Sequence, residues 1–238
     1  MRYTILFSAI LVLSSCVFEM GKPVKGDGHV VTKTRQPGSF SRVEQKGSFN
    51  LELATGSACE VQIVAEDNIA EHIETSLEAG TLVIKTRNGF RLRPTREVRI
   101  VVTAPSYTAV ESFGSGDISS NTTLTGAGSL EIRTRGSGNI RLTVQVPEVN
   151  ASTAGSGDVD LSGECNRVSL SSTGSGNLTA DRLSTETANV DIKGSGDASV
   201  YAGKELVIAV KGSGNVRYRG NPSIRSDIKG SGSVEKID

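Results

Sequence analysis

Residues 130–142 read LEIRTRGSGNIRL, and the Gly-Ser-Gly triplet in this stretch occurs seven times along the chain. Successive triplets start 22, 19, 19, 20, 18 and 18 residues apart. The second residue after each triplet is apolar, and the neighbouring segments alternate apolar with polar residues. Such alternation indicates strands buried on one face, and a β-rich repeat of about 20 residues is the length of one solenoid turn. The chain is therefore predicted to be all-β: a single-stranded parallel β-helix (β-solenoid) of about 20 residues per coil, right-handed by the usual preference of parallel crossovers.

The triplet glycines are interpreted as structural corner residues. If the alternation runs unbroken from Ile132 to Ile140, both glycines of that triplet point inward at a tight turn, where a side chain would collide with the turn's own backbone. A ligand cradle is the alternative interpretation of the triplet. The predicted corner glycines are Gly114, Gly116, Gly136, Gly138, Gly155, Gly157, Gly174, Gly176, Gly194, Gly196, Gly212, Gly214, Gly230 and Gly232.

The residue after each triplet alternates between Asp and Asn. Stacked carboxylates about 4.8 Å apart would repel each other, whereas interposed amides separate the charges and bond along the stack. We therefore predict a structural polar ladder; a row of carboxylates that binds Ca²⁺ is the alternative. The ladder residues are Asp117, Asn139, Asp158, Asn177, Asp197 and Asn215, followed by Ser233.

The N-terminus has the features of a secretory signal. Arg2 precedes an apolar run, Ile5 to Leu13, that is too short to span a bilayer as a permanent helix. The run ends in Leu-Ser-Ser-Cys, the pattern of a lipobox, so Cys16 is predicted to be lipidated after cleavage of residues 1–15. An ordinary signal peptide is the alternative. Val17 in place of Asp favours a lipid anchor in the outer membrane of the cell envelope, with its leaflet left open.

Composition divides the remaining chain. Residues 16–37 are rich in Gly, Lys and Pro and are expected to form the lipidated N-terminus and a flexible tether. Residues 38–238 are expected to form one β-solenoid domain. Within it, residues 38–105 lack the triplet and are predicted to be an N-terminal capping β region, and residues 106–238 contain the repeat coils.

Two further groups of residues in the domain have open interpretations. Cys59 and Cys165 lie far apart in the sequence and are expected to be unpaired thiols, with a disulfide as the alternative. Five arginines lie close together and are expected to be solvated, with an anion or glycan contact as the alternative. They are Arg87, Arg91, Arg93, Arg96 and Arg99.

The composition excludes several classes of function. Lys plus Arg and Asp plus Glu number 26 each, so nothing indicates a nucleic-acid partner. His29 and His72 are the only histidines, and neither belongs to a Cys/His or Asp/Glu set with metal-ligand spacing. A Gly-x-Ser-x-Gly nucleophile motif is absent from the sequence. We therefore predict no catalytic residues, no metal and no cofactor; the oligomeric state is not indicated.

The order of these features resembles the DUF2807 family, described as putative auto-transporter adhesin, head GIN domain. The resemblance covers residues 38–238 and implies a β-helical fold and frequent occurrence in Bacteroidetes envelopes. The matching residues are Phe40, Val43, Gly47, Phe49, Leu51, Leu53, Gly56, Gly80 to Ile84, Val98 to Pro105 and the seven triplets.

These features lead to one expected function and two alternatives. We expect a non-enzymatic envelope lipoprotein that contacts the membrane through its N-terminal lipid. It would serve as an adhesion or surface-interaction module, with a glycan or a protein as ligand. A periplasmic structural or assembly scaffold is the alternative, and a glycan-acting enzyme is a third possibility.

Overall fold

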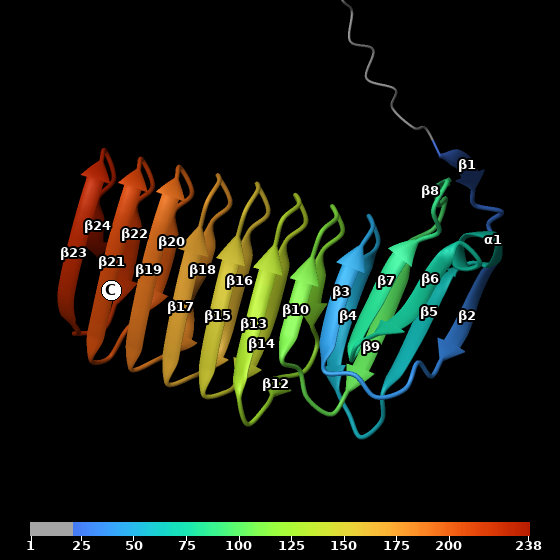
Figure 1. The fold of residues 1–238 in the computed structure, drawn as a ribbon, viewed down its shortest axis with the longest axis horizontal. Helices are drawn as coiled ribbons and strands as arrows, with labels where there is room; N and C mark the ends of the chain where they lie inside the picture. Colours follow the sequence, from blue (N-terminus) through green and yellow to red (C-terminus); the bar gives the residue numbers. More distant parts are fainter. Residues whose placement is uncertain (1–20) are drawn as a thin grey trace, which may run out of the picture.

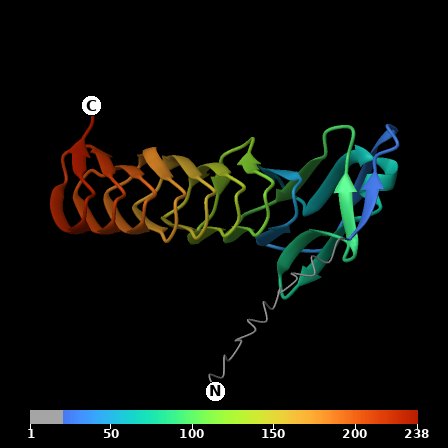
Figure 2. The same ribbon diagram turned by 90° about the horizontal axis from the view of Figure 1, so that it is seen from above.

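The computed structural model describes residues 21–238, so the signal segment and Cys16 lie outside the described residues. Two long sheets face each other along the molecule, and each coil of the chain adds one strand to each sheet (Figure 1). Viewed from above, the coils form a regular row that ends in a broader N-terminal part (Figure 2). The architecture is a β-solenoid of about seven turns with about 19 residues per turn, as the triplet spacing predicts.

The first long sheet, called sheet I below, contains ten strands in the spatial order β23-β21-β19-β17-β15-β13-β10-β3-β7-β6. Their bounds are β3 (Arg42–Lys46), β6 (Ile73–Glu78), β7 (Thr81–Thr86), β10 (Ala109–Ser112), β13 (Ser129–Thr134), β15 (Glu148–Thr153), β17 (Arg167–Ser172), β19 (Thr187–Gly194), β21 (Glu205–Gly212) and β23 (Ser223–Gly230).

The second long sheet, sheet II, contains twelve strands in the order β2-β5-β9-β4-β11-β14-β16-β18-β20-β22-β24, with β12 paired to β14. Their bounds are β2 (Val30–Arg35), β4 (Asn50–Thr55), β5 (Glu60–Glu66), β9 (Arg99–Ala104), β11 (Ile118–Ser120), β12 (Leu124–Thr125), β14 (Ile140–Gln145), β16 (Val159–Glu164), β18 (Leu178–Ser184), β20 (Ala198–Tyr201), β22 (Val216–Arg219) and β24 (Val234–Lys236).

Aliphatic side chains from successive coils lie in register between the sheets. In sheet II, Ile118 pairs with Ile140 and Ile140 with Val159, and the row continues to Val234. In sheet I, Val110 pairs with Ile132, and the row continues through β21. Burial of each large aliphatic side chain contributes roughly 1.5–3 kcal/mol to the stability of the fold. A single coil could not bury its apolar face, so the stability comes from stacking of the coils.

The predicted N-terminal cap proves to contain further coils. Strands β3 and β7 extend sheet I in parallel, and β4 and β9 extend sheet II in the same way. The segment 47–50, Gly-Ser-Phe-Asn, occupies the corner between β3 and β4 where later coils have Gly-Ser-Gly-Asp or Gly-Ser-Gly-Asn. Antiparallel strands β2, β5 and β6 then complete this end, with the four-residue helix α1 (Asp67–Ala70) between β5 and β6.

The tether prediction is wrong for residues 21–37. Strand β1 (Lys22–Lys25) pairs in parallel with β8 (Phe90–Arg93) as a separate two-stranded sheet. Strand β2 pairs antiparallel with β5 over six residues. Both segments are short and mainly polar, and they pair with strands distant in sequence, so local composition alone indicated a linker. No helix in residues 21–238 is long and apolar enough to cross a membrane.

Candidate functional site: the two corners of the coil

Each coil turns from sheet I to sheet II at the glycine triplet, a position called the glycine corner. The second glycine of the triplet is buried in six of the seven cases, while the serine between the glycines is exposed. An ideal Cβ on Gly136 would overlap the carbonyl oxygen of Gly114, and one on Gly138 would overlap that of Gly116. The obstacle is therefore the backbone of the neighbouring coil. The prediction that a side chain would collide with the turn's own backbone is therefore wrong in its reason, although the position still requires glycine.

The Asp/Asn ladder runs along this corner as a chain of hydrogen bonds. The backbone N of Asn139 donates to Asp117 Oδ1 over 2.8 Å, and the backbone N of Asp158 donates to Asn139 Oδ1 over 3.0 Å. The same pattern repeats through Asn177, Asp197, Asn215 and Ser233. Asn50, which the sequence analysis missed, begins the ladder by accepting from the backbone N of Asp117 over 3.1 Å.

A row of buried polar side chains lines the inside of the same corner, and the sequence analysis missed it. Thr134, Thr153 and Ser172 each donate a hydroxyl to the carbonyl of the second glycine of their own triplet, at 3.2, 2.8 and 3.1 Å. In the next coils aliphatic residues replace the hydroxyls: Ile192 pairs with Ser172, and Val210 pairs with Ile192. There the strand continues through the first glycine, whose φ becomes positive, 146° at Gly212.

These geometries indicate that the glycine corner is structural. One side-chain oxygen of each Asp and Asn in the ladder accepts from the backbone N of the next coil, so these side chains hold neighbouring coils together. Within residues 21–238, no three His, Cys, Asp or Glu side chains gather closely enough to hold a metal ion. Cys59 and Cys165 are free thiols, half-buried and buried respectively.

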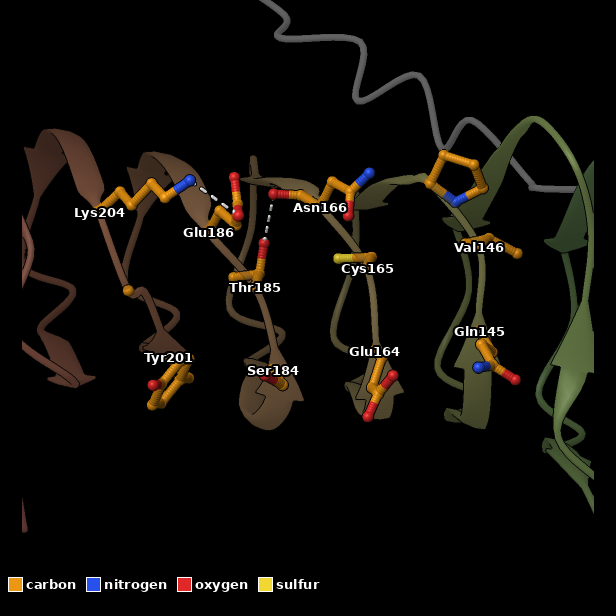
Figure 3. Close-up of a pocket in the computed structure, with 12 residues that line it drawn as sticks. Gln145, Val146, Glu164, Cys165, Asn166, Ser184, Thr185, Glu186, Tyr201 and Lys204 are labelled. Atoms are coloured by element: carbon orange, nitrogen blue, oxygen red, sulfur yellow. Dashed lines mark hydrogen bonds and ion pairs between the residues drawn. The ribbon is translucent and has the colours of Figure 1, made fainter.

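The opposite corner, where sheet II turns back to sheet I, carries a groove of about 750 Å³ that crosses four coils, called the corner groove below (Figure 3). Three parallel rows of side chains form it. The floor contains the buried residues Val146, Cys165 and Thr185. One wall contains Gln145, Glu164, Ser184 and Tyr201, and the other contains Asn166, Glu186 and Lys204.

Unequal coil lengths accompany this groove. Strand β18 has seven residues and a register shift against β16, whereas the next strand, β20, has four. The pairing of β18 with β20 stops at Ala180 and Val200, so the end of β18 extends past its neighbour. In the sequence, this difference in strand length appears as a change in triplet spacing from 20 to 18 residues.

Backbone and side-chain bonds hold the groove residues in place. The backbone N of Asn166 donates to the carbonyl of Pro147 over 2.9 Å, and the backbone N of Lys204 donates to that of Glu186 over 2.8 Å. The Thr185 hydroxyl lies 3.0 Å from the carbonyl of Asn166. Lys204 Nζ lies 2.8 Å from Glu186 Oε1. Burial raises the pKa of the Cys165 thiol, which makes this floor residue a poor nucleophile.

The groove therefore offers a ring face, amides, hydroxyls and carboxylates on a rigid corner. Tyr201 provides the ring, and Gln145, Glu164 and Ser184 stand beside it along the same wall. A concave surface with a few well-placed polar groups and an amphipathic aromatic side chain is suited to binding a polar ligand. Four coils at about 4.8 Å each match an extended ligand that runs along the stack.

Comparison with known proteins agrees with the fold. A family model described as putative auto-transporter adhesin, head GIN domain, matches residues 39–222. No curated protein matches the chain. A solved structure from Bacteroides fragilis, described as a putative adhesin, is 25% identical, covers 90% of this chain and 100% of its own, and has a TM-score of 0.85.

Two further solved structures have the same fold. A putative lipid binding protein from Parabacteroides distasonis is 26% identical, with a TM-score of 0.72; the match covers 91% of this chain and 100% of that one. A putative adhesin from Parabacteroides merdae is 21% identical, with a TM-score of 0.71 and the same coverage. At 21% identity, the similarity to the Parabacteroides merdae protein shows only that the two chains share a fold.

Proposed function

The chain belongs to the DUF2807 family of putative auto-transporter adhesin head GIN domains, and from that membership we propose that it is a non-enzymatic adhesion module of the cell envelope whose ligand is a glycan. We further propose that Cys16 carries the lipid that anchors it to the outer membrane. The corner groove is the observation that carries the choice of ligand.

Glycan binding fits the groove chemistry. Sugars present hydroxyl groups that bond to amides and carboxylates, and flat C–H faces that pack on aromatic rings. Glu164 and Gln145 supply acceptors and donors, and the Tyr201 ring supplies the packing surface. The rows repeat from coil to coil, so an extended polysaccharide could contact several equivalent positions at once, which raises avidity.

Binding is favoured over hydrolysis by the exposure of the groove carboxylates. A glycosidase depends on a general acid placed in an apolar environment. Glu164 and Glu186 are both exposed, and Glu186 is paired with Lys204. A rigid groove with solvated carboxylates is suited to holding a glycan without cleaving it.

A glycan array tests the proposal. Residues 17–238 retain every strand of the fold and should bind at least one class of glycan. Tyr201→Ala and Glu164→Ala should each weaken that binding by at least tenfold. Ser169→Ala, on the outer face of sheet I, serves as the matched control and should bind as the wild type does. Binding that survives both groove substitutions contradicts the groove assignment, and release of shortened glycan would indicate an enzyme.

Location in the envelope separates adhesion from a periplasmic scaffold. Intact cells that produce the native lipoprotein should lose the coil domain when treated with an external protease, because an adhesion module must face outward. Lysed cells provide the control for protease sensitivity. A domain that is protected in intact cells and cleaved in lysed cells would support the periplasmic scaffold instead.

A further inference from the structure

Strands β1 and β8 form a small parallel ribbon at the N-terminal end of the stack, outside both long sheets (Figure 1). The ribbon and the loop after it carry five exposed cations. Val24 and Leu92 face inward and pack against the core. The cations are Lys22, Lys25, Arg91, Arg93 and Arg96.

These five cations differ from their neighbours in having no carboxylate partner. In the same region Arg87 pairs with Glu74, Lys33 with Asp67 and Arg99 with Glu52. Within residues 21–238, no carboxylate lies within ion-pair distance of any of the five. The acids closest to these cations in sequence are Glu19, Asp27 and Glu97, so five cations stand against three acids in a molecule whose formal net charge is zero.

A hollow of about 440 Å³ adjoins the ribbon and combines two kinds of lining. Phe90, Leu92 and Pro94 provide apolar surface, while Arg91 and Arg96 also line the hollow and provide positive charge. Apolar surface beside cationic side chains suits an amphiphile with an anionic head. The hollow also touches Gly47 and Asn50, so it opens on the glycine-corner side of the first coil.

Strand β1 of the ribbon lies close in sequence to Cys16, and this position indicates which ligand the ribbon binds. Cys16 precedes Lys22 by six residues, which span at most about 20 Å when extended. An acyl chain on Cys16 would therefore hold the ribbon close to the bilayer surface, where each Lys or Arg gains about 1 kcal/mol from anionic lipid, roughly fivefold in binding. A lipid chain combined with a basic patch is a known route to stable membrane attachment.

We propose that the β1–β8 ribbon is a docking surface for an anionic phospholipid bilayer. Docking through the ribbon places the glycine-corner side of the first coil toward the membrane. The corner groove lies at the opposite corner and farther along the stack, and it stays open to an external ligand. The lipid anchor and the ribbon would thus fix the orientation of the module as well as its location.

Vesicle sedimentation with residues 17–238, which lack the lipid, measures the ribbon alone. The protein should sediment with vesicles of phosphatidylcholine and phosphatidylglycerol at three to one, and not with pure phosphatidylcholine. Replacing Lys22, Lys25, Arg91 and Arg93 by Gln should weaken binding about fivefold per cation at low salt, and 0.5 M salt should abolish it.

A charge-matched variant provides the control. Replacing Lys193, Lys211, Arg217 and Lys229 by Gln removes the same charge from the coils and should leave vesicle binding unchanged. Equal binding to both kinds of vesicle, or equal losses in the two variants, would overturn the proposal. So would binding to dextran sulfate without binding to anionic vesicles, because the ribbon would then select a polyanion rather than a bilayer. The ribbon variant should bind glycan as the wild type does. Its loss of vesicle binding can then be distinguished from a failure of the proposed glycan binding in the corner groove.

Discussion

Asn139 contacts the carboxylate of Asp117 twice: its backbone N lies 2.8 Å and its Nδ2 lies 3.2 Å from the same Oδ1. The pair recurs two coils later, where Asn177 contacts Asp158 at 2.7 and 3.1 Å. Each Asp therefore receives two donors from the coil that follows it. Consecutive carboxylates lie two coils apart, about 9.6 Å, which is comparable with the Debye length of about 8 Å at physiological salt.

Asn177→Asp should destabilise the protein at neutral pH. The substitution places three carboxylates on consecutive coils and removes the amide donor to Asp158, with an expected loss of about 1–3 kcal/mol in the free energy of unfolding. Mutual repulsion raises the folded-state pKa of such a cluster above the unfolded value of about 3.9. The deficit should therefore grow as pH rises above 4 and shrink below it.

Urea unfolding of the variant and the wild type between pH 3 and pH 7 measures this difference. Asp158→Asn is the matched control, because it keeps an acceptor oxygen on the ladder and removes a charge. It should change stability by less than about 1 kcal/mol. A deficit in Asn177→Asp that does not depend on pH would show that repulsion along the ladder is unimportant.

Gly176→Val should be severely destabilising. A Cβ at this position would overlap the carbonyl oxygen of Gly157 in the preceding coil, and the stack can relieve that overlap only by separating the coils. We expect a loss above about 3 kcal/mol, measured by thermal and urea unfolding. Ser175→Ala alters the exposed middle residue of the same triplet and should stay within about 0.5 kcal/mol. Equal melting temperatures for the two variants would refute the close-approach explanation.

Thr153→Val should test the buried hydroxyl row. The change keeps the shape of the side chain but removes the donor that lies 2.8 Å from the carbonyl of Gly157. An unsatisfied buried carbonyl costs about 1–3 kcal/mol, and urea unfolding should show a loss in that range. Ser152→Ala, one residue earlier and facing outward, is the control and should be nearly silent. If Thr153→Val leaves the free energy of unfolding unchanged, this corner tolerates the apolar geometry seen at Ile192.

The repeat architecture could be predicted because stacking in register requires equivalent residues at nearly equal spacing. The seven triplets mark that spacing directly, and the aliphatic residue after each one follows the same rule. The coil at Gly47 was missed because Phe49 stands where later coils have glycine. The row of buried polar side chains was missed because its members Gln45, Ser112 and Thr134 are different residue types that become equivalent only through strand pairing.

The corner groove could not be predicted from residue types. Its walls differ from coil to coil, and its shape reflects the difference in length between neighbouring strands β18 and β20. The ribbon was missed for a related reason: β1 pairs with β8, which lies more than sixty residues later. The Cys16 prediction lies outside the described residues and remains a prediction.

Glu66 fastens the ribbon to the body of the protein. Its side chain is fully buried and accepts hydrogen bonds from the backbone N of Gly28 at 2.7 Å and of Thr95 at 2.8 Å. The Thr95 hydroxyl and the backbone N of Arg96 complete the set. These donors lie just after β1 and just after β8, so one carboxylate ties together the two segments that leave the ribbon.

Acid should therefore loosen the ribbon before it unfolds the coils. Burial alone would raise the pKa of Glu66, but the hydrogen bonds from Thr95, Gly28 and Arg96 outweigh it and hold the pKa below its ordinary value. A depressed folded-state pKa contributes stability above the unfolded value of about 4.3, and this contribution is lost as pH falls through the folded value.

Hydrogen exchange at the Gly28 and Thr95 amides should accelerate below about pH 4, relative to amides in the coils. Glu66→Gln should exchange faster already at pH 7 and show little further change on acidification, whereas Glu60→Gln, on the same strand, should behave as the wild type does. A similar response to acid in wild type and Glu66→Gln would assign the pH dependence to another carboxylate.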